Sequence, residues 1–204
     1  MKTRFLRDVK KHKMTILKDD GVYRHLRFQQ PKTTNQYFDI VTYPNYLVIS
    51  GDMGDYVFSR LYDMFNFFST TDNKLNINIG YWTEKLKAVS KFGGKDGEVF
   101  EFSAEHTLKE LKYSGSIKNI PVKQRKEFSS AILNCSDEGD AINVMEEYNI
   151  YDSWEYLGTI PTPYIEWILY AIKWGILKYE KDVARRLKQS EKSKRKPGFL
   201  NENS

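Results

Sequence analysis

The amino-acid sequence predicts an α+β protein. In it, an antiparallel β-meander of about four or five strands in the N-terminal third packs against several helices from the C-terminal two-thirds. Two observations predict this class. Runs of β-branched and aromatic residues separated by turn residues fill residues 14–60, and apolar residues at helical spacing dominate after residue 61. Strands grouped before helices are typical of α+β folds, because one face of an antiparallel sheet is buried against helices.

The N-terminal segment predicts a short helix and then a hairpin. Residues 3–12 carry an apolar stripe followed by lysines, which suit the last turn of a helix. Residues 14–17 and 22–28 form the two predicted arms, and Asp20-Gly21 between them supplies the positive φ angle that a tight hairpin turn needs. The second arm alternates imperfectly, because Arg24 falls on its more apolar side.

The next segments complete the predicted sheet and its helices. Residues 37–43, 46–50 and 56–60 are rich in β-branched and aromatic side chains, with Pro, Asn, Gly and Asp in the gaps. Helical spacing then predicts helices over residues 61–68, 79–91, 107–113, 122–133 and 137–148, and a final helix from near Pro163. Ser136 is the predicted cap of the helix over 137–148.

The domain organisation expected from these elements is one α+β domain over residues 1–187, followed by a basic, disordered tail over residues 188–204. A single cysteine, Cys135, and the absence of an apolar leader favour a soluble protein in a reducing cytoplasm. The longest apolar stretch, residues 160–177, contains Glu166 and Lys173, so we expect a buried helix there and no membrane span.

Charge is distributed unevenly along the chain, whose formal net charge is +5. Residues 1–32 carry +7, residues 33–180 carry −7 and residues 181–204 carry +5. The body over residues 1–180 is therefore neutral, and the whole excess lies at the C-terminal end. The acidic stretch suggests one mode of action, in which it imitates nucleic acid and occupies a basic groove on a partner.

One segment could hold a metal ion. In Gly51-Asp52-Met53-Gly54-Asp55, two carboxylates lie in a glycine-punctuated turn, and Asp39 on a neighbouring strand could be a third oxygen ligand for Mg²⁺ or Mn²⁺. The simpler interpretation is that Gly and Asp are the residues a turn requires. We expect no cofactor, and because no catalytic motif is present, the residues favour a binding protein while leaving catalysis open.

Basic segments provide a second candidate site. Lys10, Lys11, Arg24 and Arg27 share the N-terminal region with aromatic side chains, and this combination can grip a phosphate backbone and stack bases. The basic C-terminal segment could add non-specific contacts to the same ligand. The alternative is a solvated surface with no ligand.

Two segments, residues 37–68 and residues 77–85 (Ile-Asn-Ile-Gly-Tyr-Trp-Thr-Glu-Lys), resemble a group of small phage and prophage accessory proteins. The resemblance covers the first half of the chain and carries over no activity or site residue. It implies a setting, namely a phage accessory gene acting inside a bacterium, where such proteins often inhibit host defence.

Together these observations give a first hypothesis and two alternatives. The first is a phage-encoded binding protein that inhibits a bacterial defence or nucleic-acid machine by direct protein contact, in the manner of anti-CRISPR proteins. Tyr43 and Tyr46, which flank the Pro44-Asn45 turn, are its predicted partner-binding residues. The alternatives are a metal-dependent enzyme acting on nucleic acid and a nucleic-acid-binding accessory protein.

Overall fold

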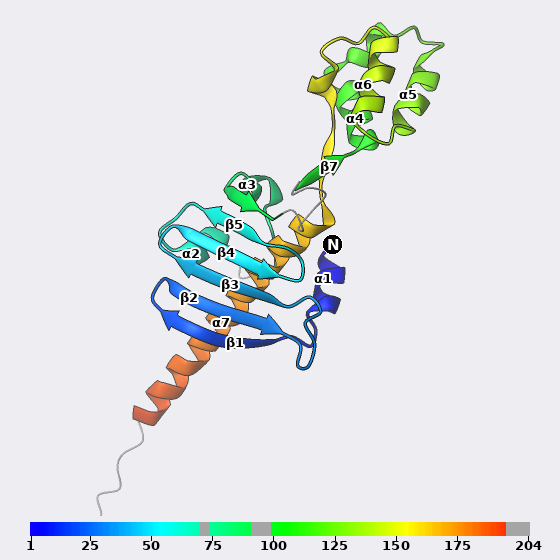
Figure 1. Cartoon of the computed structure of the whole chain (residues 1–204). Coiled ribbons are helices and arrows are strands. Elements are labelled where there is room, and N and C mark those ends of the chain that lie inside the picture. The colour runs from blue at the N-terminus through cyan, green and yellow to red at the C-terminus, as the bar shows by residue number, and fades with distance from the viewer. Residues whose placement is uncertain (70–73, 91–98, 195–204) are drawn as a thin grey trace, which may run out of the picture. The chain divides into compact units, whose positions relative to one another are not determined.

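The computed structural model describes residues 1–69, 74–90 and 99–194 (Figure 1). The chain forms two compact units. Unit 1 comprises residues 1–97 and 163–204, and unit 2 comprises residues 98–162, so unit 2 is inserted into the chain of unit 1. This differs from the single domain expected over residues 1–187. In the sequence, glycines at positions 93, 94 and 97 and prolines at positions 161 and 163 lie beside the two ends of the insertion, but they were not interpreted as a domain boundary.

Unit 1 is built on a six-stranded antiparallel sheet in which every strand pairs with its neighbour in the chain. The α+β class is confirmed, with one strand more than expected. The strands, in spatial and chain order, are β1 (Lys13–Asp20), β2 (Tyr23–Gln29), β3 (Phe38–Tyr43), β4 (Tyr46–Gly51), β5 (Tyr56–Ser59) and β6 (Leu86–Val89). Asp20-Gly21 and Pro44-Asn45 fall at two of the connections between consecutive strands, as predicted, whereas the connection between β2 and β3 spans residues 30–37.

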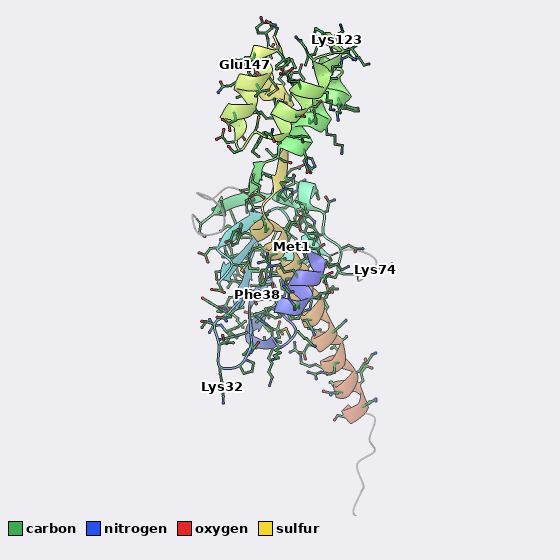
Figure 2. The ribbon with its side chains drawn as sticks, turned by 90° about the vertical axis from the view of Figure 1, so that its right-hand side faces the viewer. Met1, Lys32, Phe38, Lys74, Lys123 and Glu147 are labelled. Atoms are coloured by element: carbon green, nitrogen blue, oxygen red, sulfur yellow. The ribbon has the colours of Figure 1, made fainter. Side chains whose placement is uncertain are left out.

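One face of this sheet is covered by helices. These are α1 (Lys2–Asp8), α2 (Met64–Phe68), α3 (Ile79–Thr83) and α7 (Pro163–Lys194). The view in Figure 2 shows α1 and α7 on the same side of the sheet. Aromatic rings fill the space between: Phe38 lies 4.8 Å from Phe28 and 5.7 Å from Trp167 between ring centroids, and Phe5 of α1 lies 5.2 Å from Trp167. The core of unit 1 is therefore the layer between the sheet and α7.

A glycine allows α7 to approach the sheet closely. A Cβ atom at Gly175 would lie 2.7 Å from a methyl carbon of Ile40 and 3.1 Å from the ring of Phe28. A side chain at position 175 would thus push the helix away from β2 and β3, and the close packing there depends on its absence.

The segment from 79 to 91, predicted as one helix, is instead the short helix α3 followed by strand β6. Val57 pairs with Ala88 and Tyr56 with Val89. The spacing of Trp82, Leu86 and Val89 fits a helix, but β5 would otherwise expose an unpaired edge, and pairing that edge outweighs local helical spacing. The helix predicted over 61–68 begins at Met64, because Asp63 caps it by accepting a hydrogen bond from the Phe65 amide.

The long helix α7 begins at Pro163, as predicted, but continues further than predicted. Residues 188–194 were expected to belong to the disordered tail, yet they form its last two turns, and residues 195–204 lie outside the described residues. Lys173 is 1% exposed within the core portion of the helix. Among the described residues, no helix has the length and apolar character needed to cross a membrane.

Unit 2 is a small helical bundle closed by a two-stranded ribbon. Its elements are β7 (Phe100–Phe102), α4 (Ala104–Ser114), the 3₁₀ turn η2 (Ser116–Asn119), α5 (Arg125–Leu133), α6 (Glu138–Glu147), the 3₁₀ turn η3 (Ser153–Tyr156) and β8 (Thr159–Pro161). Strand β7 pairs with β8, which brings together the two ends of the inserted segment.

Unit 2 has its own hydrophobic core. Its buried members are Leu108, Leu111, Ile120, Phe128, Ile132, Ala141, Met145 and Ile150.

The N-terminal cap of α6 differs from the prediction. Asp137 accepts the hydrogen bond from the Asp140 amide, while the predicted cap, Ser136, donates its hydroxyl to the Asp140 carboxylate. Asp137 prevails because its carboxylate is one residue closer to the first helical turn.

Candidate functional site

The face of the unit 1 sheet opposite α1 and α7 presents a row of valines. Val41, Val48 and Val57 pair in register across β3, β4 and β5, and each is half-buried between its neighbours. Their chain neighbours Ile40 and Ile49 point to the helix side and are 0% exposed. In the described part of unit 1, α1, α2 and α7 all lie on that other side (Figure 1).

Two tyrosines extend this row at the end of the β3–β4 hairpin. Tyr43 pairs with Tyr46 across the Pro44-Asn45 turn, and their rings stack with centroids 5.1 Å apart and an interplanar angle of 21°. They are 40% and 36% exposed. Asn45 adopts a φ of 70°, which the two-residue turn requires. We name this surface the Val/Tyr face and define it as Val41, Tyr43, Tyr46, Val48 and Val57.

Charge next to the Val/Tyr face is neutralised internally. Asp39, the residue of β3 that precedes the row on this face, accepts hydrogen bonds from Arg27 at 2.8 and 2.7 Å and from His25 Nε2 at 3.0 Å. Burial opposes ionisation of Asp39, but the hydrogen bonds from Arg27 and His25 outweigh it, so the pKa of the carboxyl lies below its ordinary value. The centre of the face is consequently uncharged.

Arg24, a predicted nucleic-acid contact, lies on the opposite side of β2. Its guanidinium donates two hydrogen bonds of 2.9 Å to the Asp63 carboxylate, and its Cζ lies 4.5 Å above the ring of Phe65. The side chain is 11% exposed. Burial disfavours its charge, but the hydrogen bonds that it donates to the Asp63 carboxylate outweigh this and raise the pKa of Arg24. Arg24 thus joins β2 to the start of α2 and offers no charge to a ligand, which corrects the prediction.

The four basic residues predicted as one nucleic-acid site are not brought to one surface. Arg27 lies on the outer face and is engaged by Asp39. Lys10 and Lys11 are exposed in the turn that follows α1. With Arg24 on the helix side of the sheet, the sequence neighbours are separated, because adjacent positions of a strand point to opposite faces.

Two of the three aspartates proposed as metal ligands, Asp39 and Asp52, bind other groups, and the third, Asp55, is exposed. Both oxygens of Asp39 are used by Arg27, and Asp52 accepts the Gln36 amide at 2.7 Å. A Cβ at Gly51 would lie 2.2 Å from the Tyr37 carbonyl oxygen, so glycine is required there by close approach of the backbone. Among the described residues, no group of three or more His, Cys, Asp or Glu side chains could hold a metal ion. These contacts favour the turn interpretation of residues 51–55.

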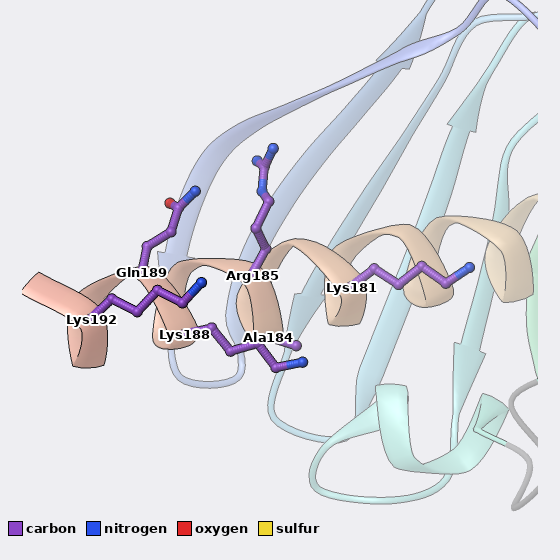
Figure 3. A pocket seen from close by; sticks show the side chains of 6 residues that line it. All are labelled: Lys181, Ala184, Arg185, Lys188, Gln189 and Lys192. Carbon is purple, nitrogen blue, oxygen red and sulfur yellow. The ribbon is translucent and has the colours of Figure 1, made fainter.

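A surface that sequence reasoning did not identify lies on α7. Lys181, Ala184, Arg185, Lys188, Gln189 and Lys192 line a shallow hollow along one side of the helix (Figure 3). The signal was present in the sequence as the spacing 178, 181, 185, 188 and 192. It went unused because this segment was expected to be disordered from residue 188. We define the basic α7 face as Lys178, Lys181, Arg185, Lys188 and Lys192.

The two units also differ in charge. Unit 1 contains 26 Lys and Arg against 15 Asp and Glu, a net charge of +11, and unit 2 contains 6 against 12, a net charge of −6. The acidic character assigned to residues 33–180 therefore belongs mainly to the inserted unit.

Comparisons of the chain with protein-family models, with curated proteins and with solved structures each returned no match.

Proposed function

We propose that this protein acts by binding another protein through the Val/Tyr face, and that the partner is a bacterial defence or nucleic-acid-processing machine that the contact inhibits. The observation that carries the first part is an exposed sheet surface with an uncharged centre and a stacked tyrosine pair at its edge. The second part rests on the resemblance to phage accessory proteins.

The chemistry of the Val/Tyr face suits a protein partner with an apolar, weakly charged surface. Aromatic residues are enriched and charged residues depleted at the cores of protein interfaces. Tyr43 and Tyr46 are already stacked on each other, so their rings are ordered before contact and lose little conformational freedom on binding. A flat row of valines between them and the polar Asp39 cluster supplies area that binding can desolvate.

Single-stranded nucleic acid fits the same surface less well. Base-binding sheets present separate aromatic rings together with free cations, which hold the phosphates. Here Tyr43 and Tyr46 stack on each other, each through one face of its ring, and the neighbouring guanidinium of Arg27 is hydrogen-bonded to Asp39. These contacts favour a protein over a nucleic acid as the ligand of this face.

The test is a comparison of three full-length proteins. Tyr43→Ala/Tyr46→Ala removes the stacked pair, and Tyr113→Ala/Tyr151→Ala removes two tyrosines of unit 2 that are 90% and 71% exposed. Each bait is incubated with nuclease-treated bacterial lysate, and captured proteins are quantified by mass spectrometry. We expect a captured protein to be lost from the first variant and retained by the second. Equal capture by all three proteins would contradict the proposal.

A second measurement addresses inhibition. Wild type and the same two variants are expressed in a bacterium with an active phage-defence system, and phage plating efficiency is counted. Wild type and Tyr113→Ala/Tyr151→Ala should raise plating efficiency, and Tyr43→Ala/Tyr46→Ala should not. If light scattering shows a dimer that Tyr43→Ala/Tyr46→Ala dissociates, the partner is a second copy and the heterologous proposal is wrong.

A further inference from the structure

The basic α7 face is a straight line of cations on one side of a helix. Lys178, Lys181, Arg185, Lys188 and Lys192 recur every three or four residues, which places them on one side over four turns. The acidic residues of this segment, Glu180, Asp182 and Glu191, fall outside that spacing. All five cations are exposed, and Figure 3 shows the strands of the sheet behind the helix.

Internal contacts leave most of this charge available. Among the described residues, Lys181, Lys188 and Lys192 take part in no ion pair. Asp182 pairs with both Arg185 and Arg186, and Arg186 also pairs with Asp19, so two carboxylates match the two guanidiniums and the available charge is that of the lysines. Surface charge in this region thus differs from that of the sheet, where each arginine has its own carboxylate.

The helix that carries the line is held in place. On the side of α7 that faces the sheet, the Tyr179 hydroxyl donates to Asp19 at 2.6 Å, and Arg186 donates to the other oxygen of Asp19 at 3.0 Å. Both contacts anchor α7 to β1, beyond the apolar core. The basic face up to Arg185 is therefore held at the sheet, and Lys188 and Lys192 continue the same helix beyond the last contact with β1.

The array extends toward α1. A second hollow beside it is lined by Lys2 and Leu6 of α1 together with Trp174, Leu177, Lys178 and Lys181. Lys178 lies 5.1 Å from the centroid of the Trp174 ring, which holds its ammonium group at the surface. Lys2 thus adds a further cation at the end of the line.

We propose that the basic α7 face binds the phosphate backbone of a nucleic-acid duplex without sequence specificity. From Lys178 to Lys192 the line covers about 21 Å, at about 1.5 Å per residue. One strand of a duplex places a phosphate every 3.4 Å or so along its axis, so about six phosphates lie within that length. A rigid line of cations suits a rigid line of phosphates.

Two other polyanions fit this face less well. Single strands are bound mainly by stacking of their bases on aromatic rings, and Trp174, the aromatic side chain that lines the neighbouring hollow, is half-buried against Phe28. Membrane-surface helices bury a wide apolar face opposite their cations. Here the opposite side of α7 is tied to β1 through Asp19.

The test uses full-length protein and a fluorescently labelled DNA duplex of arbitrary sequence, with affinity measured by anisotropy over a series of salt concentrations. With four or five phosphates neutralised, the plot of log K against log[salt] should have a slope of about −4. Lys181→Gln/Lys188→Gln/Lys192→Gln should weaken binding on the order of 100-fold at physiological salt and make the slope less steep by about 3.

The matched control is Lys118→Gln/Lys123→Gln/Lys126→Gln, which removes the same charge from exposed positions of unit 2. It should bind duplex within about threefold of wild type, and melting temperatures should show that both variants fold.

An equal loss of duplex affinity in both variants, or no salt-dependent binding by wild type, would overturn the proposal. Tighter binding of a single strand of the same length, or of phosphatidylserine vesicles, would overturn the duplex assignment. Tyr43→Ala/Tyr46→Ala should retain duplex binding, which separates this site from the proposed function.

Discussion

The sheet of unit 1 and the basic α7 face differ in whether their cationic side chains are paired with carboxylates. Around the sheet, Arg24 and Arg27 each meet a carboxylate within 3 Å, and the exposed centre of the outer face is uncharged. On α7, three lysines of the basic face have no ion pair among the described residues, although the same turns of the helix also carry acidic residues. The difference teaches that the arginines of the sheet are matched by carboxylates, whereas lysines without an ion pair in the described residues line one side of α7.

The largest effect that would test this comparison concerns Arg24. Arg24→Met keeps the volume of the side chain but leaves the Asp63 carboxylate, 20% exposed, without its partner. Removing one member of a largely buried pair costs about 3 kcal/mol of unfolding free energy, as measured by urea denaturation. The control is Arg186→Met on α7, where the arginine is 48% exposed and the loss should stay below about 1 kcal/mol. Similar losses from both variants would erase the distinction between a buried and an exposed ion pair.

Arg24 also shows how far sequence reasoning reaches. Alternation in β2 placed it on the apolar side, and that irregularity correctly marked an arginine facing the core. Its partner Asp63 lies 39 residues away, however, and no local pattern predicts such a pairing. A strand bearing two arginines was therefore assigned to one ligand, although its side chains point to two faces.

The same limit explains what else the sequence did and did not predict. Strands β3, β4 and β5 were predicted closely, because alternation and turn residues are local signals. Strand β6 was missed because its stability depends on the edge of β5, and the ends of unit 2 were missed because the pairing of β7 with β8 joins residues 60 apart. Tyr43 and Tyr46 were predicted to be exposed from their place beside a turn, and they are.

A second prediction concerns how the unfolding free energy depends on pH through the Asp39 carboxylate, which is hydrogen-bonded to Arg27 and His25. Since its pKa in the folded state lies below its unfolded value of about 3.9, the stabilisation it gives is complete above that value and is lost as pH falls through the lowered pKa. Asp39→Asn should cost about 1–2 kcal/mol at neutral pH and should flatten the loss of stability below about pH 4. Thermal unfolding of both proteins over acidic pH values measures this. An unchanged acid profile in the variant would show that Asp39 does not contribute to it.

A smaller effect is expected at Lys10 and Lys11, the exposed lysines first predicted as nucleic-acid contacts. They follow α1 at the end opposite to Lys2, so they lie outside the basic α7 face. Lys10→Gln/Lys11→Gln should change duplex affinity by less than about threefold at physiological salt, where charges act over about 8 Å. Lys181→Gln/Lys188→Gln, with the same loss of charge, should cost about 30-fold. Equal effects would restore the N-terminal region as part of the site.

The smallest expected change in stability comes from removing the end of α7. Residues 187–193 are all exposed, and the last side-chain contact between α7 and the sheet in the described residues is the one from Arg186 to Asp19. Deletion of residues 188–204 should therefore alter the unfolding free energy by less than about 0.5 kcal/mol. The same deletion removes Lys188 and Lys192, so duplex affinity and its salt dependence should fall together. Capture of a protein partner through the Val/Tyr face should be unchanged, because that face lies on the other side of the sheet from α7.

Two outcomes of this deletion would contradict the expectation. A large drop in melting temperature would show that the end of α7 supports the fold. Loss of the protein partner on truncation would show that the Val/Tyr face and the basic α7 face bind one ligand.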